Sequence, residues 1–125
     1  MKEIVVSDRA PAAIGPYSQA IKSGGLLFVS GQIPLDPAKG TMVEGGIATQ
    51  TRQVLKNVKE IVEAAGFTLQ NVVKCSCFLK NMEDFTDFNE VYAEYFSETP
   101  PARECMEAAR LPKDASVEIS AICAK

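Results

Sequence analysis

The sequence contains no histidine among its 125 residues. This absence removes the commonest general base, the commonest metal ligand and every Ser-His or Cys-His nucleophilic arrangement. Any chemistry must therefore use carboxylates, Arg, Lys, Tyr, Cys or backbone groups. The glycine spacings of the P-loop and of dinucleotide-binding turns are missing too, so Gly45-Gly46 is interpreted as a turn ahead of a helix.

Long apolar runs and strong net charge are also lacking. Apolar segments such as Leu26–Val29 are far shorter than the roughly 18 residues that a membrane-spanning helix requires. The N-terminus, with Lys2 and Glu3 ahead of two valines, has no secretory leader pattern, so we expect a cytoplasmic protein. The net charge of −3, without a concentrated basic face, argues against a nucleic-acid partner.

The composition is that of an ordinary globular protein, with 46% apolar and 23% charged residues. A chain of this length fits one domain, which we place at residues 1–125. Cys75 and Cys77 alternate onto one strand face, whereas Cys105 and Cys123 are isolated, so zinc-type spacing is absent. We therefore expect reduced cysteines that serve mainly as small core residues, and no metal site.

Local patterns predict strands and helices in turn. Apolar residues at helical spacing predict a helix over 47–65 that is stopped by Gly66, and an aromatic stripe after a capping Asp84 predicts a second helix. The predicted strands are 26–30, 72–79, 102–110 and 115–123, the last two forming a hairpin through 111–114. This order favours an α+β fold with the helices on one face of a mixed or antiparallel sheet.

Two charged residues on the predicted strands are candidates for the chemistry. Arg103 follows Pro101-Ala102, and a guanidinium at a strand start can grip a carboxylate with two hydrogen bonds. Glu118 lies between two apolar residues and is either a functional carboxylate or part of a solvent face. In the predicted hairpin they are roughly 17 to 20 Å apart. They therefore serve different purposes or meet across a subunit interface.

Six segments carry recognisable motifs: 13–20, 29–33, 71–74, 101–103, 111–113 and 117–119. Together they resemble the Rid family of reactive-intermediate imine/enamine deaminases, which also carries the label L-PSP endoribonuclease, from about residue 8 to the C-terminus. The resemblance implies a chorismate-mutase-like protomer of the bacillus type and a homotrimer with clefts between neighbouring subunits. It also implies hydrolysis of 2-aminoacrylate, 2-iminopropanoate or 2-iminobutanoate to a 2-keto acid and ammonia, without a cofactor or metal.

Carried onto this sequence, the resemblance makes Arg103 the holder of the substrate carboxylate and makes Glu118 the group that positions and activates water. The other residues that it implies around the cleft are Tyr17, Ser30, Gly31, Asn89 and Cys105. Gly31 and Cys105 would contribute mainly through their backbone.

One residue departs from the family pattern, which usually has a small residue after the Pro-Ala-Arg segment. This chain has Glu104, a carboxylate that could weaken anion binding, although strand alternation predicts that it points away from Arg103. Two other functions remain open. A non-catalytic sensor or regulator that binds keto acids or small carboxylates needs Arg103 but not Glu118. An endoribonuclease or translation inhibitor fits the acidic, histidine-free chain least well.

Overall fold

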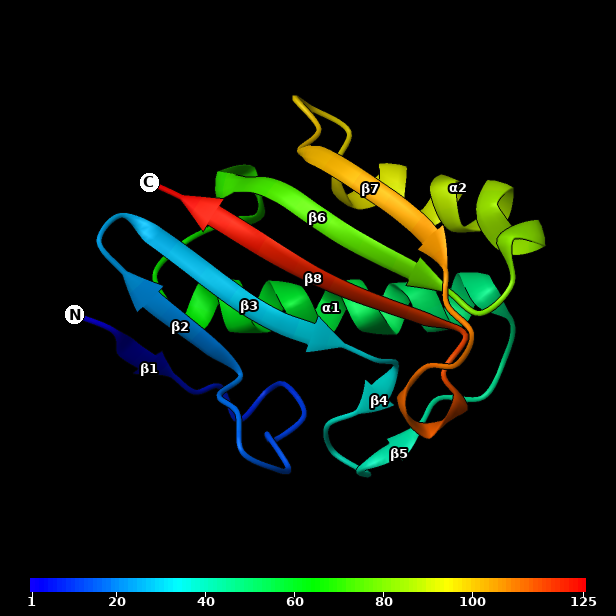
Figure 1. The fold of residues 1–125 in the computed structure, drawn as a ribbon, viewed down its shortest axis with the longest axis horizontal. Coiled ribbons are helices and arrows are strands. Elements are labelled where there is room, and N and C mark those ends of the chain that lie inside the picture. The colour runs from blue at the N-terminus through cyan, green and yellow to red at the C-terminus, as the bar shows by residue number, and fades with distance from the viewer.

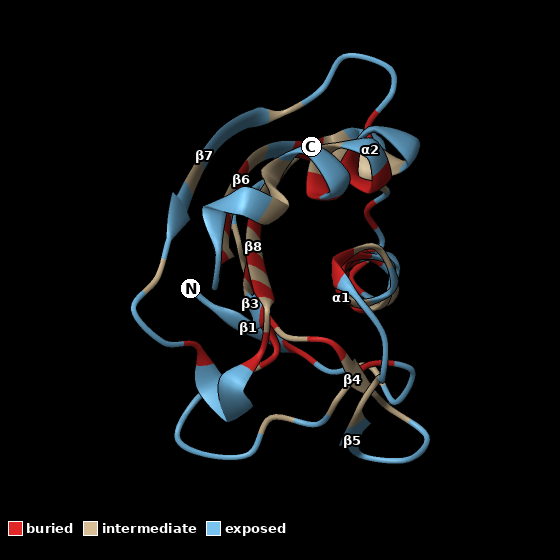
Figure 2. Ribbon diagram, turned by 90° about the vertical axis from the view of Figure 1, so that its right-hand side faces the viewer, coloured by how far each residue is buried: buried red, intermediate tan, exposed pale blue.

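The computed structural model describes residues 1–125 as one six-stranded sheet with both long helices on one face (Figures 1 and 2). In spatial order the strands are β1 (Glu3–Val5), β2 (Ala20–Ser23), β3 (Leu26–Gln32), β8 (Val117–Ala124), β6 (Val72–Leu79) and β7 (Ala102–Glu107). A two-stranded ribbon of β4 (Leu35–Asp36) and β5 (Thr41–Met42) lies below the sheet in Figure 1. Only the pairing of β6 with β7 is parallel, so the sheet is mixed and the predicted α+β class is confirmed.

The first helix, α1 (Ile47–Ala64), matches its prediction closely. Its apolar residues recur every three or four positions and are buried against the sheet, with Val54, Leu55 and Val58 fully inaccessible. The helix ends at Ala64, and Gly66 follows with a φ of 84°, a left-handed conformation that glycine adopts without a Cβ penalty. Neither this helix nor any other has the length and apolar character needed to cross a membrane.

The second helix, α2 (Phe85–Tyr95), carries the predicted aromatic stripe into the core. The rings of Phe88, Tyr92 and Phe96 are buried and follow one another at centroid distances of 5.6 and 4.8 Å. Asp84 occupies the N-cap position, but its side chain makes no capping hydrogen bond, so that part of the prediction is wrong. A short 3-10 turn precedes the helix, and Asn81 caps this turn by accepting from the Glu83 N–H.

The predicted hairpin of the last two strands is wrong. β7 ends at Glu107 and pairs in parallel with β6, while β8 lies between β3 and β6. The residues between them contain a 3-10 turn, Pro112–Asp114, with Lys113 at φ 54°. The physical reason is burial: every second residue of β8 is buried, which suits a central strand, whereas β7 is largely exposed and takes the edge.

The two faces of the sheet differ in what covers them. The face beneath the helices contains Cys75 and Cys77, both fully buried as core residues, as predicted. No helix covers the opposite face, which Figure 2 shows on the side away from α1 and α2. Alternation directs Phe28 and Met106 to this open face, where they are 42% and 48% exposed. The open face is therefore partly apolar in the protomer.

Candidate functional site

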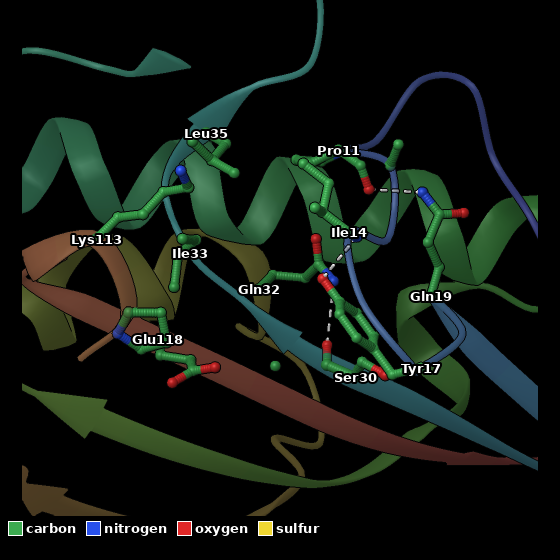
Figure 3. Close-up of a pocket in the computed structure, with 13 residues that line it drawn as sticks. Pro11, Ile14, Tyr17, Gln19, Ser30, Gln32, Ile33, Leu35, Lys113 and Glu118 are labelled. Carbon is green, nitrogen blue, oxygen red and sulfur yellow. Dashed lines mark hydrogen bonds between the residues drawn. The ribbon is translucent and has the colours of Figure 1, made fainter. Parts of the chain in front are cut away.

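A pocket of about 540 Å³ lies where the end of β3 meets the start of β8 (Figure 3). The loop between β1 and β2 forms one wall, and the 3-10 turn before β8 forms another. Its lining residues include Ile14, Tyr17, Ser30, Gly31, Lys113 and Glu118. Four residues predicted from the sequence as site residues therefore share one pocket, namely Tyr17, Ser30, Gly31 and Glu118.

Glu118 supplies the carboxylate of this pocket. Its neighbours Val117 and Ile119 are buried towards the helices, so alternation turns Glu118 to the open face of the sheet. Burial alone raises the pKa of its carboxyl group, because no partner hydrogen bond or nearby charge compensates the lost hydration. A partly buried, unpaired carboxylate of this kind can accept a proton from water and return it.

Gly31 allows the backbone of β3 to run directly against this carboxylate. A Cβ at this position would lie only 2.9 Å from the carboxyl carbon of Glu118 and would clash with one of its oxygens. The register of β3 and β8 is irregular between Val29 and Gln32, so the strand bulges here. The bulge and the glycine together place backbone groups of β3 beside Glu118.

Ser30 and Tyr17 add polar atoms to the pocket. The Ser30 hydroxyl donates to the Ser18 carbonyl at 2.6 Å, which leaves its oxygen free to accept from a ligand. The Tyr17 hydroxyl accepts a long hydrogen bond of 3.4 Å from the Ile14 N–H. Figure 3 shows the Tyr17 side chain on the same side of the pocket as Ser30. Polar groups thus gather beside otherwise apolar walls.

Sequence reasoning missed two buried glutamines that shape this pocket. The Gln19 side chain accepts from the Ser7 N–H at 2.7 Å and donates to the Pro11 carbonyl at 2.7 Å, which holds the loop before β2 in place. Gln32 donates to the Ser30 carbonyl at 3.1 Å. A polar residue within or beside an apolar strand is the signal that could have indicated them, because buried polar groups need hydrogen-bond partners.

The remaining predicted site residues form a second group, away from this pocket. Arg103 on β7 donates from its guanidinium to the Asn89 side-chain oxygen at 2.7 Å. Its guanidinium carbon lies 4.8 Å from the ring centroid of Tyr92. Cys105 lies two residues farther along β7, and burial raises the pKa of its thiol, which therefore stays neutral. None of Arg103, Asn89 and Cys105 lines the pocket that contains Glu118.

Within one chain, Arg103 and Glu118 are kept apart by the sheet. Arg103 is opposite Cys75 and Glu118 is opposite Phe78 on the intervening strand β6. Three residues along the strand and two strand spacings across it correspond to roughly 14 Å between the two Cα atoms. Arg103 points to the same face as its partner Cys75, towards the helices, and Glu118 points to the same face as its partner Phe78, the open face. The side chains of Arg103 and Glu118 therefore lie on opposite faces of the sheet. The hairpin behind the sequence estimate is wrong, but a single chain still does not bring the two residues together.

Glu104 points away from Arg103, as alternation predicts. Its carboxylate accepts from the Ser76 hydroxyl at 2.5 Å and lies 3.2 Å from the Lys74 ammonium. The hydrogen bond from Ser76, followed by the contact with Lys74, lowers the pKa of Glu104. Its negative charge is thus compensated on the open face and does not lie beside the guanidinium.

Together the fold and the pocket define a small α+β protein with a water-accessible carboxylate and no cluster of three or more potential metal-ligating side chains. The model of the family described as Endoribonuclease L-PSP matches residues 7–125. The chain therefore belongs to this family, the Rid family that its sequence motifs resemble.

Curated relatives match over nearly their whole length. A RutC family protein of Pyrococcus horikoshii is 57% identical over 100% of this chain and 99% of its own. A Salmonella typhimurium protein named 2-iminobutanoate/2-iminopropanoate deaminase is 46% identical over 100% of this chain and 99% of its own. The crystal structure of Escherichia coli TdcF with bound serine is 42% identical, covers 98% of each chain and has a TM-score of 0.95. The fold and the family are thus shared across bacteria and archaea.

Proposed function

We propose that this protein hydrolyses 2-imino acids and their enamine tautomers to 2-keto acids and ammonia, in the cytoplasm and without a cofactor. The observation that carries the proposal is the unpaired, partly buried Glu118 carboxylate packed against Gly31 in the pocket. The deaminase name of the Salmonella relative supports the same reaction class. The candidate substrates are 2-aminoacrylate, 2-iminopropanoate and 2-iminobutanoate.

The proposed reaction needs one group that moves protons and one that holds an anion. Glu118 takes a proton from water as the oxygen bonds to the imine carbon, which gives a tetrahedral carbinolamine. The same carboxyl group delivers this proton and then the proton of the new hydroxyl group to the nitrogen, so that the C–N bond breaks, ammonia leaves and the keto group forms. An enamine first becomes the imine by gaining a proton at its terminal carbon and losing one from its nitrogen. No step requires a histidine, in keeping with its absence.

The site is complete only when a second chain is added. Arg103 is suited to hold the substrate carboxylate through two parallel hydrogen bonds, but it lies on the other face of the sheet from Glu118. We therefore propose a homotrimer of chorismate-mutase-like protomers, in which Arg103, Asn89 and Cys105 of one subunit complete the pocket of its neighbour. The exposed Phe28 and Met106 on the open face support such an interface, because burying apolar surface favours association.

A second candidate is a sensor that binds keto acids or amino acids without chemistry. It is favoured by the serine bound to TdcF, which shows that a relative with this fold accommodates a small carboxylate. The endoribonuclease description of the family model receives no support from the site, because the chain is acidic and has no histidine for RNA cleavage.

The experiment that separates these functions is a coupled assay. A pyridoxal-phosphate dehydratase generates 2-aminoacrylate, and keto-acid formation is followed with wild type, Arg103→Ala and Glu118→Gln. We expect acceleration over spontaneous hydrolysis by wild type alone, with Glu118→Gln still binding pyruvate. If wild type binds pyruvate but gives no rate above the spontaneous one, the deaminase proposal is wrong and the sensor replaces it.

A further inference from the structure

We propose that α2 orients the Arg103 guanidinium for carboxylate binding, with Tyr92 and Asn89 as positioning residues that act through Arg103. This inference deepens the proposed function and rests on it, since it explains how the anion-binding half of the site is prepared before substrate arrives. It also gives Asn89 a different task from the direct substrate contact expected from the family resemblance.

The helix presents a continuous surface to the guanidinium. Phe85, Phe88 and Tyr92 follow one another at helical spacing, and their ring centroids lie 5.5, 5.8 and 4.8 Å from the guanidinium carbon. Phe88 and Tyr92 are buried in the core and cannot move freely, so the platform is rigid. Asn89 on the same helix accepts one N–H at 2.7 Å and fixes the rotation of the guanidinium plane.

None of these contacts neutralises the arginine. Arg52 and Arg110 are paired with Glu94 and Asp114, whereas Arg103 makes no salt bridge. It is held only by aromatic faces and by an uncharged amide. The guanidinium has five N–H donors, so most of them remain for a carboxylate after Asn89 takes one. Arg103 is thus ordered while its charge stays available, which lowers the entropy lost on binding an anion.

The Tyr92 hydroxyl offers a matched control. It is buried without a hydrogen bond of ordinary geometry, and the nearby Cys75 thiol is only a weak partner. Burial raises the pKa of this hydroxyl, so it stays neutral. If the aromatic face is what orients Arg103, Tyr92→Phe keeps the affinity for the carboxylate and Tyr92→Leu weakens it.

Asn89 offers a second control, because Asp has nearly the same shape. Asn89→Asp keeps an acceptor for the Arg103 N–H but places a negative charge beside it. If Asn89 only supports the fold, Asn89→Asp leaves anion binding unchanged. If Asn89 orients the Arg103 guanidinium without neutralising its charge, Asn89→Asp weakens the binding of an anionic ligand.

The test measures binding of pyruvate by titration calorimetry together with KM and kcat in the coupled assay, on variants whose thermal unfolding and assembly match wild type. We expect Tyr92→Phe to resemble wild type. Tyr92→Leu and Asn89→Asp should each weaken pyruvate binding and raise KM about tenfold, with kcat changed less, because the lost interaction is with the bound carboxylate. Phe85→Leu, at a less buried ring, replaces Tyr92→Leu if that variant does not fold.

Two outcomes would overturn the inference. Wild-type pyruvate binding by both Tyr92→Leu and Asn89→Asp, while Arg103→Ala loses it, would leave the proposed function standing and remove the role of α2. If Tyr92→Phe and Tyr92→Leu lose the same affinity for pyruvate, the aromatic ring of Tyr92 is not what orients Arg103. Unchanged binding in Arg103→Ala would instead contradict the anion site itself, and with it the proposed function.

Discussion

Arg103 on β7 and Glu118 on β8 lie on the two strands that flank β6, yet their side chains point to opposite faces of the sheet. Arg103 lies over the aromatic side chains of α2, whereas Glu118 lies in the pocket beside Gly31. A substrate small enough to have its carboxylate and its imine carbon in adjacent positions cannot contact both residues of one chain. The proposed homotrimer therefore requires each protomer to contribute Arg103 to one site and Glu118 to another.

The raised pKa of Glu118 predicts the pH dependence of the reaction. In the proposed mechanism the active form of Glu118 is the carboxylate, so kcat/KM should fall as the pH drops through a pKa raised above the ordinary glutamate value. Glu118→Gln should lose on the order of 100-fold or more above this pKa and less below it, because the variant should show no such acid limb. The measurement is kcat/KM in the coupled assay as a function of pH, over the pH range in which the coupling enzymes remain stable. An acid limb that persists in Glu118→Gln would assign the titration to another group.

Gly31→Ala should impair activity through Glu118. The added Cβ would meet the Glu118 carboxylate, so the side chain must turn away from the position it holds in the pocket. We expect kcat to fall at least tenfold, while unfolding stability changes by no more than about 1 to 3 kcal/mol. Gly46→Ala is the matched control, because a Cβ there meets nothing within 4 Å. Equal activity in the two variants would show that the contact is unimportant.

Gln19→Ala should loosen the loop that forms one wall of the pocket. It removes the hydrogen bonds to the Ser7 N–H and the Pro11 carbonyl and leaves buried polar groups unpaired. We expect a loss of about 1 to 3 kcal/mol in stability and faster proteolysis before β2. Urea denaturation measures the loss of stability. Gln70→Ala is the control, because the Gln70 side chain is exposed. A variant as stable and protease-resistant as wild type would contradict the assigned role of Gln19.

Glu104→Ala should leave carboxylate binding almost unchanged. Although Glu104 follows Arg103 in sequence, it points to the open face and is paired with Ser76 and Lys74. Removing it takes away a charge that is already compensated, so we expect less than about a threefold change in the pyruvate dissociation constant. A much tighter complex in titration calorimetry would mean that Glu104 acts on the anion site after all.

The helices could be predicted from sequence because their signal is local. The spacing of apolar residues in α1 and of aromatic residues in α2 is set by the helical repeat itself. The neighbours of β7 and β8 could not be predicted this way, because strand pairing joins distant residues and β8 enters the sheet between strands formed much earlier in the chain. The predicted hairpin pairs β7 with β8, the next strand in sequence, whereas in the structure β7 pairs with β6.

The candidate site followed the same division. Tyr17, Ser30, Gly31 and Glu118 line one pocket, and only the motif resemblance connected them in the sequence. Periodicity alone left Glu118 equally compatible with a solvent face. The hydrogen bonds of Gln19 and the aromatic contacts of Arg103 depend on the packing of separate elements, so local pattern could not indicate them.

The most direct test of the account is complementation between Arg103→Ala and Glu118→Gln. Each variant alone should be inactive, but subunits mixed by reversible unfolding should form some sites with an intact Arg103 from one chain and an intact Glu118 from another. Random mixing predicts about one quarter of the wild-type activity towards 2-aminoacrylate. If mixed oligomers form, as seen by native mass spectrometry, and the rate stays at that of spontaneous hydrolysis, the shared catalytic site is wrong.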